Sequence, residues 1–175
     1  MEEQNVTHGT FIIERSYPTP PERVFAAFAD AAKKRRWFAE GETHEIQEFS
    51  MDFRDGGSER MRYRFREGTP YPGLVLTNEG RYQDIVPNRR IVTAWTMSLE
   101  GKHISASLVT CEFRATEKGT NLVCTHQGVY IDFVEGPQTL EAGWRQLLEG
   151  LGKELSGEKG TGDKITSATQ HAAQA

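Results

Sequence analysis

The side chains that could take part in the most kinds of chemistry in this sequence are one histidine and two cysteines. All three lie in two neighbouring strand-like segments. By alternation, His126 shares a strand face with Cys124 and Tyr130, and we expect that face to point into a core. A histidine there can orient a polar group of a ligand or transfer a proton. It can equally be a buried side chain that the backbone or a neighbouring hydroxyl satisfies. Since no second ionisable partner can be placed from the sequence, we assign no catalytic residue.

The two cysteines flank a turn, so their pairing depends on the register of a hairpin. If the hairpin is symmetric about Glu117-Lys118, Cys111 lies opposite Cys124. A register shifted by one pair places Cys111 beside His126 instead. These residue types could form a disulfide or a Cys-Cys-His metal site, but three ligands without a fourth candidate do not predict a zinc site. We therefore expect two small core residues, no metal and no cofactor.

Aromatic side chains form the second group of candidates, because they recur on faces that the strand and helix periods turn inward. An aromatic face is usually core, but several rings on a concave face can line a cavity. We expect Trp95 and Trp144 in the wall of such a cavity, with His126 or Tyr82 orienting a polar group. Trp37 and Phe38 would lie at its mouth. The full set of candidate ligand contacts is Trp37, Phe38, Tyr63, Phe65, Tyr82, Trp95, Met97, Phe113, His126 and Trp144.

Basic side chains gather in a short run and in an alternating row on one strand. They would suit an acidic partner or phosphates, or they form a solvated face balanced by glutamates. The run is Lys33 to Arg36, the row is Arg60, Arg62, Arg64 and Arg66, and the glutamates are Glu42, Glu45, Glu48 and Glu59. A net charge of −4 and a pI near 5.8 argue against nucleic acid.

We interpret Asp52, Asp55 and Glu59 as part of a turn, because they lack the spacing of a calcium loop.

Composition is that of a globular protein, with 175 residues, 37% hydrophobic and 26% charged. The acidic, polar start from Met1 to Gly9 has no apolar segment of a secretion signal. No apolar run approaches the roughly 20 residues that a membrane helix needs. Two cysteines are too few for a disulfide framework, which suits a reducing compartment. We expect a cytoplasmic protein without a membrane segment, as a monomer or homodimer.

Strand signals dominate the chain. Ser58 to Glu67 shows the pattern most clearly, because apolar and basic residues alternate strictly. The expected strands are Gly9–Tyr17, Thr43–Phe53, Ser58–Glu67, Leu74–Val86, Arg90–Leu99, His103–Ala115 and Thr120–Ile131. After the first strand, Thr19 to Glu22 has the form of a capping box and predicts a short helix. Asp30 can cap a second short helix that ends near Trp37-Phe38.

A single helix closes the pattern, from Thr139 to Leu155. Its apolar residues recur at three-and-four spacing: Leu140, Trp144, Leu147, Leu148, Leu151 and Leu155. A sheet this long with one helix to cover it must curl around that helix, and one helix rarely fills such a concavity. The sequence thus predicts an internal ligand cavity. We expect one domain over residues 1–155 and, from its polar composition, a disordered tail over 156–175.

The chain resembles the START-like superfamily, also called SRPBCC. Within it, the chain is most similar to the domain named after activators of the ninety-kilodalton heat-shock protein's ATPase. The similarity extends in unbroken order over roughly residues 9 to 155. It rests on Pro20 to Phe25, Trp37-Phe38, Asp52 to Gly57, Gly80 to Pro87, Ile91 to Trp95, Val109 to Phe113, Gly119-Thr120, Thr125-His126 and Gly143-Trp144 with Leu147 and Leu151.

This resemblance implies an α+β helix-grip fold: a curved antiparallel sheet wrapped around a long C-terminal helix, with two short helices near the N-terminus. Such relatives often hold a hydrophobic small molecule or lipid between helix and sheet. Others are polyketide cyclases or aromatases, and some bind a chaperone, so the fold leaves the function open. The chaperone-binding relatives carry a further N-terminal domain, for which we expect no room here. We expect a ligand-binding module rather than an enzyme, with a co-chaperone-like domain and a cyclase as alternatives.

Overall fold

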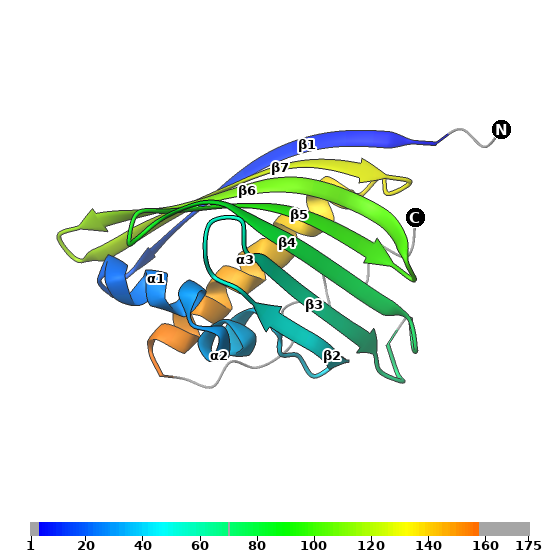
Figure 1. Ribbon diagram of the computed structural model, residues 1–175, viewed down its shortest axis with the longest axis horizontal. Helices are drawn as coiled ribbons and strands as arrows, with labels where there is room; N and C mark the ends of the chain where they lie inside the picture. Colours follow the sequence, from blue (N-terminus) through cyan, green and yellow to red (C-terminus); the bar gives the residue numbers. More distant parts are fainter. Residues whose placement is uncertain (1–3, 70, 158–175) are drawn as a thin grey trace.

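The computed structural model describes residues 4–69 and 71–157, so residues 158–175 of the predicted tail lie outside it. Strands and helices follow one another as drawn in Figure 1. The strands are β1 (Val6–Tyr17), β2 (His44–Met51), β3 (Ser58–Phe65), β4 (Val75–Val86), β5 (Arg90–Leu99), β6 (Lys102–Thr116) and β7 (Gly119–Ile131). The helices are α1 (Pro21–Ala29), α2 (Ala31–Lys34), the π-helical segment η1 (Arg35–Ala39) and α3 (Gly136–Leu155).

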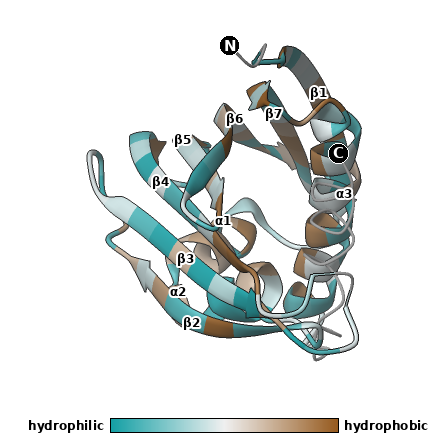
Figure 2. Ribbon diagram, turned by 90° about the vertical axis from the view of Figure 1, so that its right-hand side faces the viewer, coloured by the Kyte–Doolittle hydropathy of each residue, from teal (hydrophilic) through white to brown (hydrophobic). Residues whose placement is uncertain are grey.

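The strands form one antiparallel sheet in the order β1-β7-β6-β5-β4-β3-β2. Alternation sets its two faces: Met61, Tyr63 and Phe65 of β3 are each at most 2% exposed. The sheet curves, and α3 runs along its concave side (Figure 2). Leu148 and Leu151 of α3 are fully buried there. The α+β helix-grip arrangement expected from the sequence is confirmed. No helix within the described ranges is long and apolar enough to cross a membrane.

The predicted capping box at Thr19 is wrong. The helix α1 begins at Pro21 with Pro20 as its N-cap, and among the described residues no side-chain hydrogen bond caps it. Glu22 is therefore one position too close to the helix start to complete a capping box. Thr19 is buried instead, and its carbonyl accepts a hydrogen bond from the Thr120 hydroxyl at 2.7 Å. This contact ties the entry of α1 to the start of β7.

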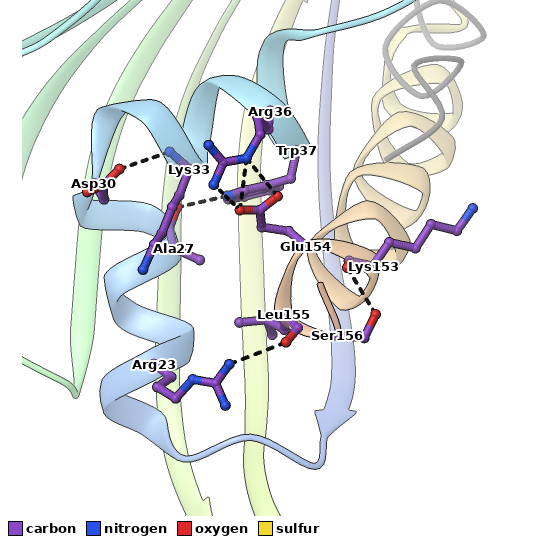
Figure 3. A network of polar contacts seen from close by, with 10 residues as sticks. All are labelled: Arg23, Ala27, Asp30, Lys33, Arg36, Trp37, Lys153, Glu154, Leu155 and Ser156. Atoms are coloured by element: carbon purple, nitrogen blue, oxygen red, sulfur yellow. Dashed lines mark hydrogen bonds and ion pairs between the residues drawn. The ribbon is translucent and has the colours of Figure 1, made fainter. Parts of the chain in front are cut away.

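The short helices are fastened to the C-terminal end of α3 by polar contacts (Figure 3). As expected, Asp30 caps α2, because its carboxylate accepts a hydrogen bond from the Lys33 backbone amide at 2.9 Å. The Arg36 guanidinium donates to Glu154 of α3 at 2.5 Å. The indole N–H of Trp37 donates to the Ala27 carbonyl at 2.8 Å and so fixes η1 against α1. These contacts hold the following residue, Phe38, against the core, where it is 6% exposed.

Candidate ligand-binding site

A cavity lies between α3 and the concave face of the sheet. About 70 Å³ is open to the centres of water-sized molecules, which is room for about five of them. Its walls are mainly apolar and aromatic, with a few polar groups among them. The polar residues of the lining besides His126 and Tyr63 are Asn78, Thr96, Ser105 and Ser107. An apolar cavity with a few convergent polar groups is the usual form of a small-molecule site.

Six of the ten predicted ligand contacts line this cavity: Phe38, Tyr63, Trp95, Met97, His126 and Trp144. They come from η1, β3, β5, β7 and α3, so the fold gathers them from segments far apart in the sequence. Phe38 is at the centre of this aromatic group. Its ring centroid is 6.0 Å from that of Trp95, in a stacked arrangement, and 6.0 Å from that of Trp144.

Four predicted contacts lie elsewhere. Tyr82 lines a second, smaller cavity. Trp37 lines neither cavity, because its indole faces the carbonyl of Ala27 on α1. Phe65 and Phe113 also lie outside both linings and pack against other aromatic rings. These rings are Tyr63 and Tyr71 for Phe65, and Phe25 and Phe28 for Phe113.

His126 is buried in the wall of the main cavity, at 3% exposure. Its ring stacks on Phe11 with centroids 4.6 Å apart. Burial lowers the pKa of His126 to about 4, so the imidazole is neutral near pH 7. Within the described residues, neither His126 Nδ1 nor Asn78 Oδ1 has a hydrogen-bond partner, although both residues line the cavity. Buried polar atoms normally have partners, so these two offer hydrogen-bonding capacity to a bound molecule.

A buried ion pair is the main feature that the sequence did not reveal. Lys34 Nζ lies 2.6 Å from Glu59 Oε2, and the two residues are 5% and 1% exposed. The Tyr82 hydroxyl donates to the same carboxylate oxygen. Lys34 was expected in a surface run and Glu59 on a solvated face, and both expectations are wrong. Strand alternation could have placed Glu59 in the core, because it lies two residues before Met61 on the same strand and therefore faces the same, inward side.

The second cavity lies beside this pair and offers about 20 Å³ to the centres of water-sized molecules. Lys34, Tyr82 and Thr93 supply its polar lining. Phe38, Trp95, Val109 and Trp144 line both cavities. Glycine at position 80 lets the Trp95 ring lie close to β4, since a Cβ on Gly80 would be 2.8 Å from that ring. The indole of Trp95 thus forms part of the partition between the two cavities.

The cysteines pair as in the symmetric hairpin, with Cys111 opposite Cys124. The alternative register beside His126 is wrong, because His126 pairs with Val109. Both cysteines are free and buried, with their Sγ atoms 3.2 Å apart. The hydrogen bond to Cys111, together with burial, raises the pKa of the Cys124 thiol. In residues 4–69 and 71–157, no three His, Cys, Asp or Glu side chains cluster as metal ligands would.

The outer face of β3 carries three arginines of the predicted row, Arg60, Arg62 and Arg64, while Arg66 follows the end of the strand. Part of the charge of this row is balanced. Arg60 forms ion pairs with Glu48, at 3.0 Å, and with Glu79. With Lys34 buried, the basic surface is smaller than the sequence suggests.

The curved antiparallel sheet, the helix along its concave side and the apolar cavity between them define a helix-grip protein. The family described as Activator of Hsp90 ATPase homolog 1-like protein matches residues 18–156. The chain belongs to this family, and the resemblance inferred from the sequence is confirmed.

Solved structures agree with this assignment. An uncharacterized protein from Rhizobium leguminosarum is 36% identical with a TM-score of 0.80, covering 89% of this chain and 99% of that one. A protein from Rhizobium loti is 43% identical with a TM-score of 0.77, covering 86% and 99%. An AHSA1-like protein from Aeromonas hydrophila shares the fold at 18% identity and a TM-score of 0.62, covering 85% and 93%. A search of curated proteins found no match.

Proposed function

We propose that this protein binds an apolar or aromatic small molecule, or a lipid-like one, between α3 and the sheet. The observation that carries this proposal is the mainly apolar cavity, with two buried polar atoms in its lining residues that have no hydrogen-bond partner in the described part of the chain. Burial of apolar surface would provide the affinity, at about 25 cal/mol for each Å². His126, neutral near pH 7, and Asn78 would orient a polar group of the ligand.

Other functions within the family have less support from the site. A cyclase-type enzyme needs a positioned acid–base pair, whereas no carboxylate or amine is among the described residues that line the main cavity with His126. A co-chaperone-like role would use the basic surface, which is reduced by the burial of Lys34 and by the ion pairs of Arg60. That role rests on family membership alone. Stimulation of an Hsp90-type ATPase by the purified protein would support the co-chaperone-like role.

Native mass spectrometry tests the proposal on protein purified gently from its own host. We expect an added mass that is lost on denaturation and that identifies the chemical class of the ligand. The Ser107→Leu variant fills the cavity from β6 and should lose this mass. The matched control is Thr110→Leu on the same strand, whose half-buried side chain lines neither cavity. A clean apo mass for the wild type, or an equal ligand load in Ser107→Leu, would contradict the proposal.

A further inference from the structure

The buried pair of Lys34 and Glu59 has no role in holding a purely apolar molecule. Both side chains are at least 94% buried, and their nitrogen and oxygen are 2.6 Å apart. Replacing such a pair by apolar residues is often neutral or stabilising, so stability does not explain its presence. A charged pair beside an otherwise apolar cavity is therefore a candidate for recognition.

The Lys34 ammonium has N–H donors beyond the one that it uses in its hydrogen bond to Glu59. It carries three N–H donors, and Glu59 is its single hydrogen-bond acceptor within the described part of the chain. Its other neighbours are faces of aromatic rings, with Nζ 4.8 Å from the Phe38 centroid and 5.6 Å from that of Trp95. Lys34 lines the small cavity but Glu59 does not. A group that enters beside the Lys34 ammonium would therefore meet a hydrogen-bond donor and needs to be an acceptor.

The dimensions restrict what can enter. The small cavity offers about 20 Å³ to the centres of water-sized molecules, which is room for one or two atoms of that size. It shares Phe38, Trp95, Val109 and Trp144 with the main cavity. A ligand would thus keep its body in the main cavity and extend one small group past the Trp95 indole.

Charge decides between neutral and anionic acceptors. Lys34 and Glu59 together are neutral, and among the described residues Lys34 is the one cationic side chain that lines the small cavity. A carboxylate would place an uncompensated negative charge close to Glu59 in a buried site, which is costly. A neutral carbonyl oxygen would accept a hydrogen bond from Lys34 and leave the net charge of the site unchanged.

We propose that the small cavity recognises the carbonyl oxygen of an apolar ligand, with Lys34 Nζ as its hydrogen-bond donor. The inference rests on the proposed function, because the body of that ligand occupies the main cavity. It narrows the ligand to apolar ketones, aldehydes, esters or amides with an accessible carbonyl group.

A matched pair of probes tests this inference: acetophenone, and ethylbenzene, in which CH₂ replaces the carbonyl. Dissociation constants are measured by NMR titration for the wild type and for a variant with Lys34→Met and Glu59→Gln together. The double change avoids an unpaired buried charge. We expect the variant to bind acetophenone about tenfold more weakly and ethylbenzene with unchanged affinity. Lys33→Met is the matched control, because that lysine is exposed on the same helix.

The infrared carbonyl stretch of bound acetophenone gives a second readout that needs no variant. A hydrogen bond from the ammonium should shift this band to lower wavenumber than in cyclohexane. An unshifted band, or an equal loss of affinity for both probes in the double variant, would overturn the carbonyl site and leave the proposed function intact. If neither probe binds the wild type up to its solubility limit, the carbonyl site is overturned, whereas the proposed function is contradicted by a clean apo mass in native mass spectrometry.

Discussion

The imidazole of His126 is stacked on Phe11 and almost removed from water, and this environment controls its protonation. Burial lowers its pKa from 6.5 to about 4 in the folded protein. Between these values the unfolded chain binds a proton that the native state does not. The stability contribution is therefore complete above about pH 6.5 and is lost as the pH falls toward 4. Burial also lowers the pKa of His44, which adds a contribution of the same sign.

The pH dependence gives the first prediction. Between pH 7.5 and pH 5, the His126 titration should lower the free energy of unfolding by about 2 kcal/mol. Replacing His126→Gln removes this titration but keeps a polar side chain of similar size. Urea denaturation at both pH values should show that the variant loses about 2 kcal/mol less than the wild type. An identical loss in both proteins would show that His126 is not the buried neutral group described above.

The ion pair gives the second prediction. Lys34→Met alone leaves the Glu59 carboxylate buried without its cation and should lower the free energy of unfolding by about 3–5 kcal/mol. Adding Glu59→Gln should recover most of this loss, because the remaining groups are neutral. A double-mutant cycle from urea denaturation measures the coupling. Equal stability of the single and double variants would mean that the two side chains are not coupled in the folded protein.

At the scale of elements, the contact between β4 and β5 sets the position of the cavity partition. Gly80 pairs with Trp95 across these strands, and the indole occupies the space that a side chain at position 80 would take. A Cβ there would lie 2.8 Å from the ring, so the ring would have to move. By contrast, a Cβ on Gly152 of α3 would meet the Tyr17 ring at an ordinary 3.4 Å.

These two glycines give the third prediction. Gly80→Ala should cost about 1–3 kcal/mol of unfolding free energy and alter the tryptophan signal in near-ultraviolet circular dichroism. Gly152→Ala should leave that signal unchanged and stabilise the protein by up to about 1 kcal/mol, because alanine favours a helix. Thermal and urea denaturation of the two variants provide the comparison. An unchanged tryptophan signal in Gly80→Ala would place the indole away from β4.

Strand and helix periods predicted the elements and the inward face well, because both depend on local repetition. Alternation placed Tyr63 and His126 in the core, and both line the cavity. Lys34 was missed because it lies where α2 passes into the π-helical η1, so the usual helix period does not place it. Its partner Glu59 lies 25 residues away in sequence, and such a pairing leaves no periodic signal. Trp37 and Phe38 are neighbours, but only the packing of η1 decides which of them lines the cavity.

At the scale of the whole molecule, the cavity would couple binding of the proposed ligand to folding. A ligand that binds only the folded state stabilises it according to its concentration relative to its dissociation constant. The long helix α3 and strands from across the sheet share the cavity wall, so ligand contacts would depend on the assembled fold. A bound apolar molecule should therefore protect the entire sheet-and-helix assembly against denaturation.

This coupling gives the fourth prediction. Ethylbenzene at ten times its dissociation constant should raise the free energy of unfolding by about 1.4 kcal/mol, measured by urea denaturation. The cavity-filling Ser107→Leu variant should show no such gain, while Thr110→Leu should respond like the wild type. A gain of equal size in Ser107→Leu would place the bound probe outside the cavity.

The strand order also has a consequence for synthesis on the ribosome. Strands β2 to β7 pair with their sequence neighbours, whereas β1, made first, pairs along its whole length with β7, made last. During translation the apolar side chains of β1, such as Phe11 and Ile13, have no sheet to join until β7 has left the exit tunnel. Contacts between such distant segments form slowly, and exposed strand edges promote aggregation. The nascent chain is therefore most vulnerable in the interval before its first and last strands meet.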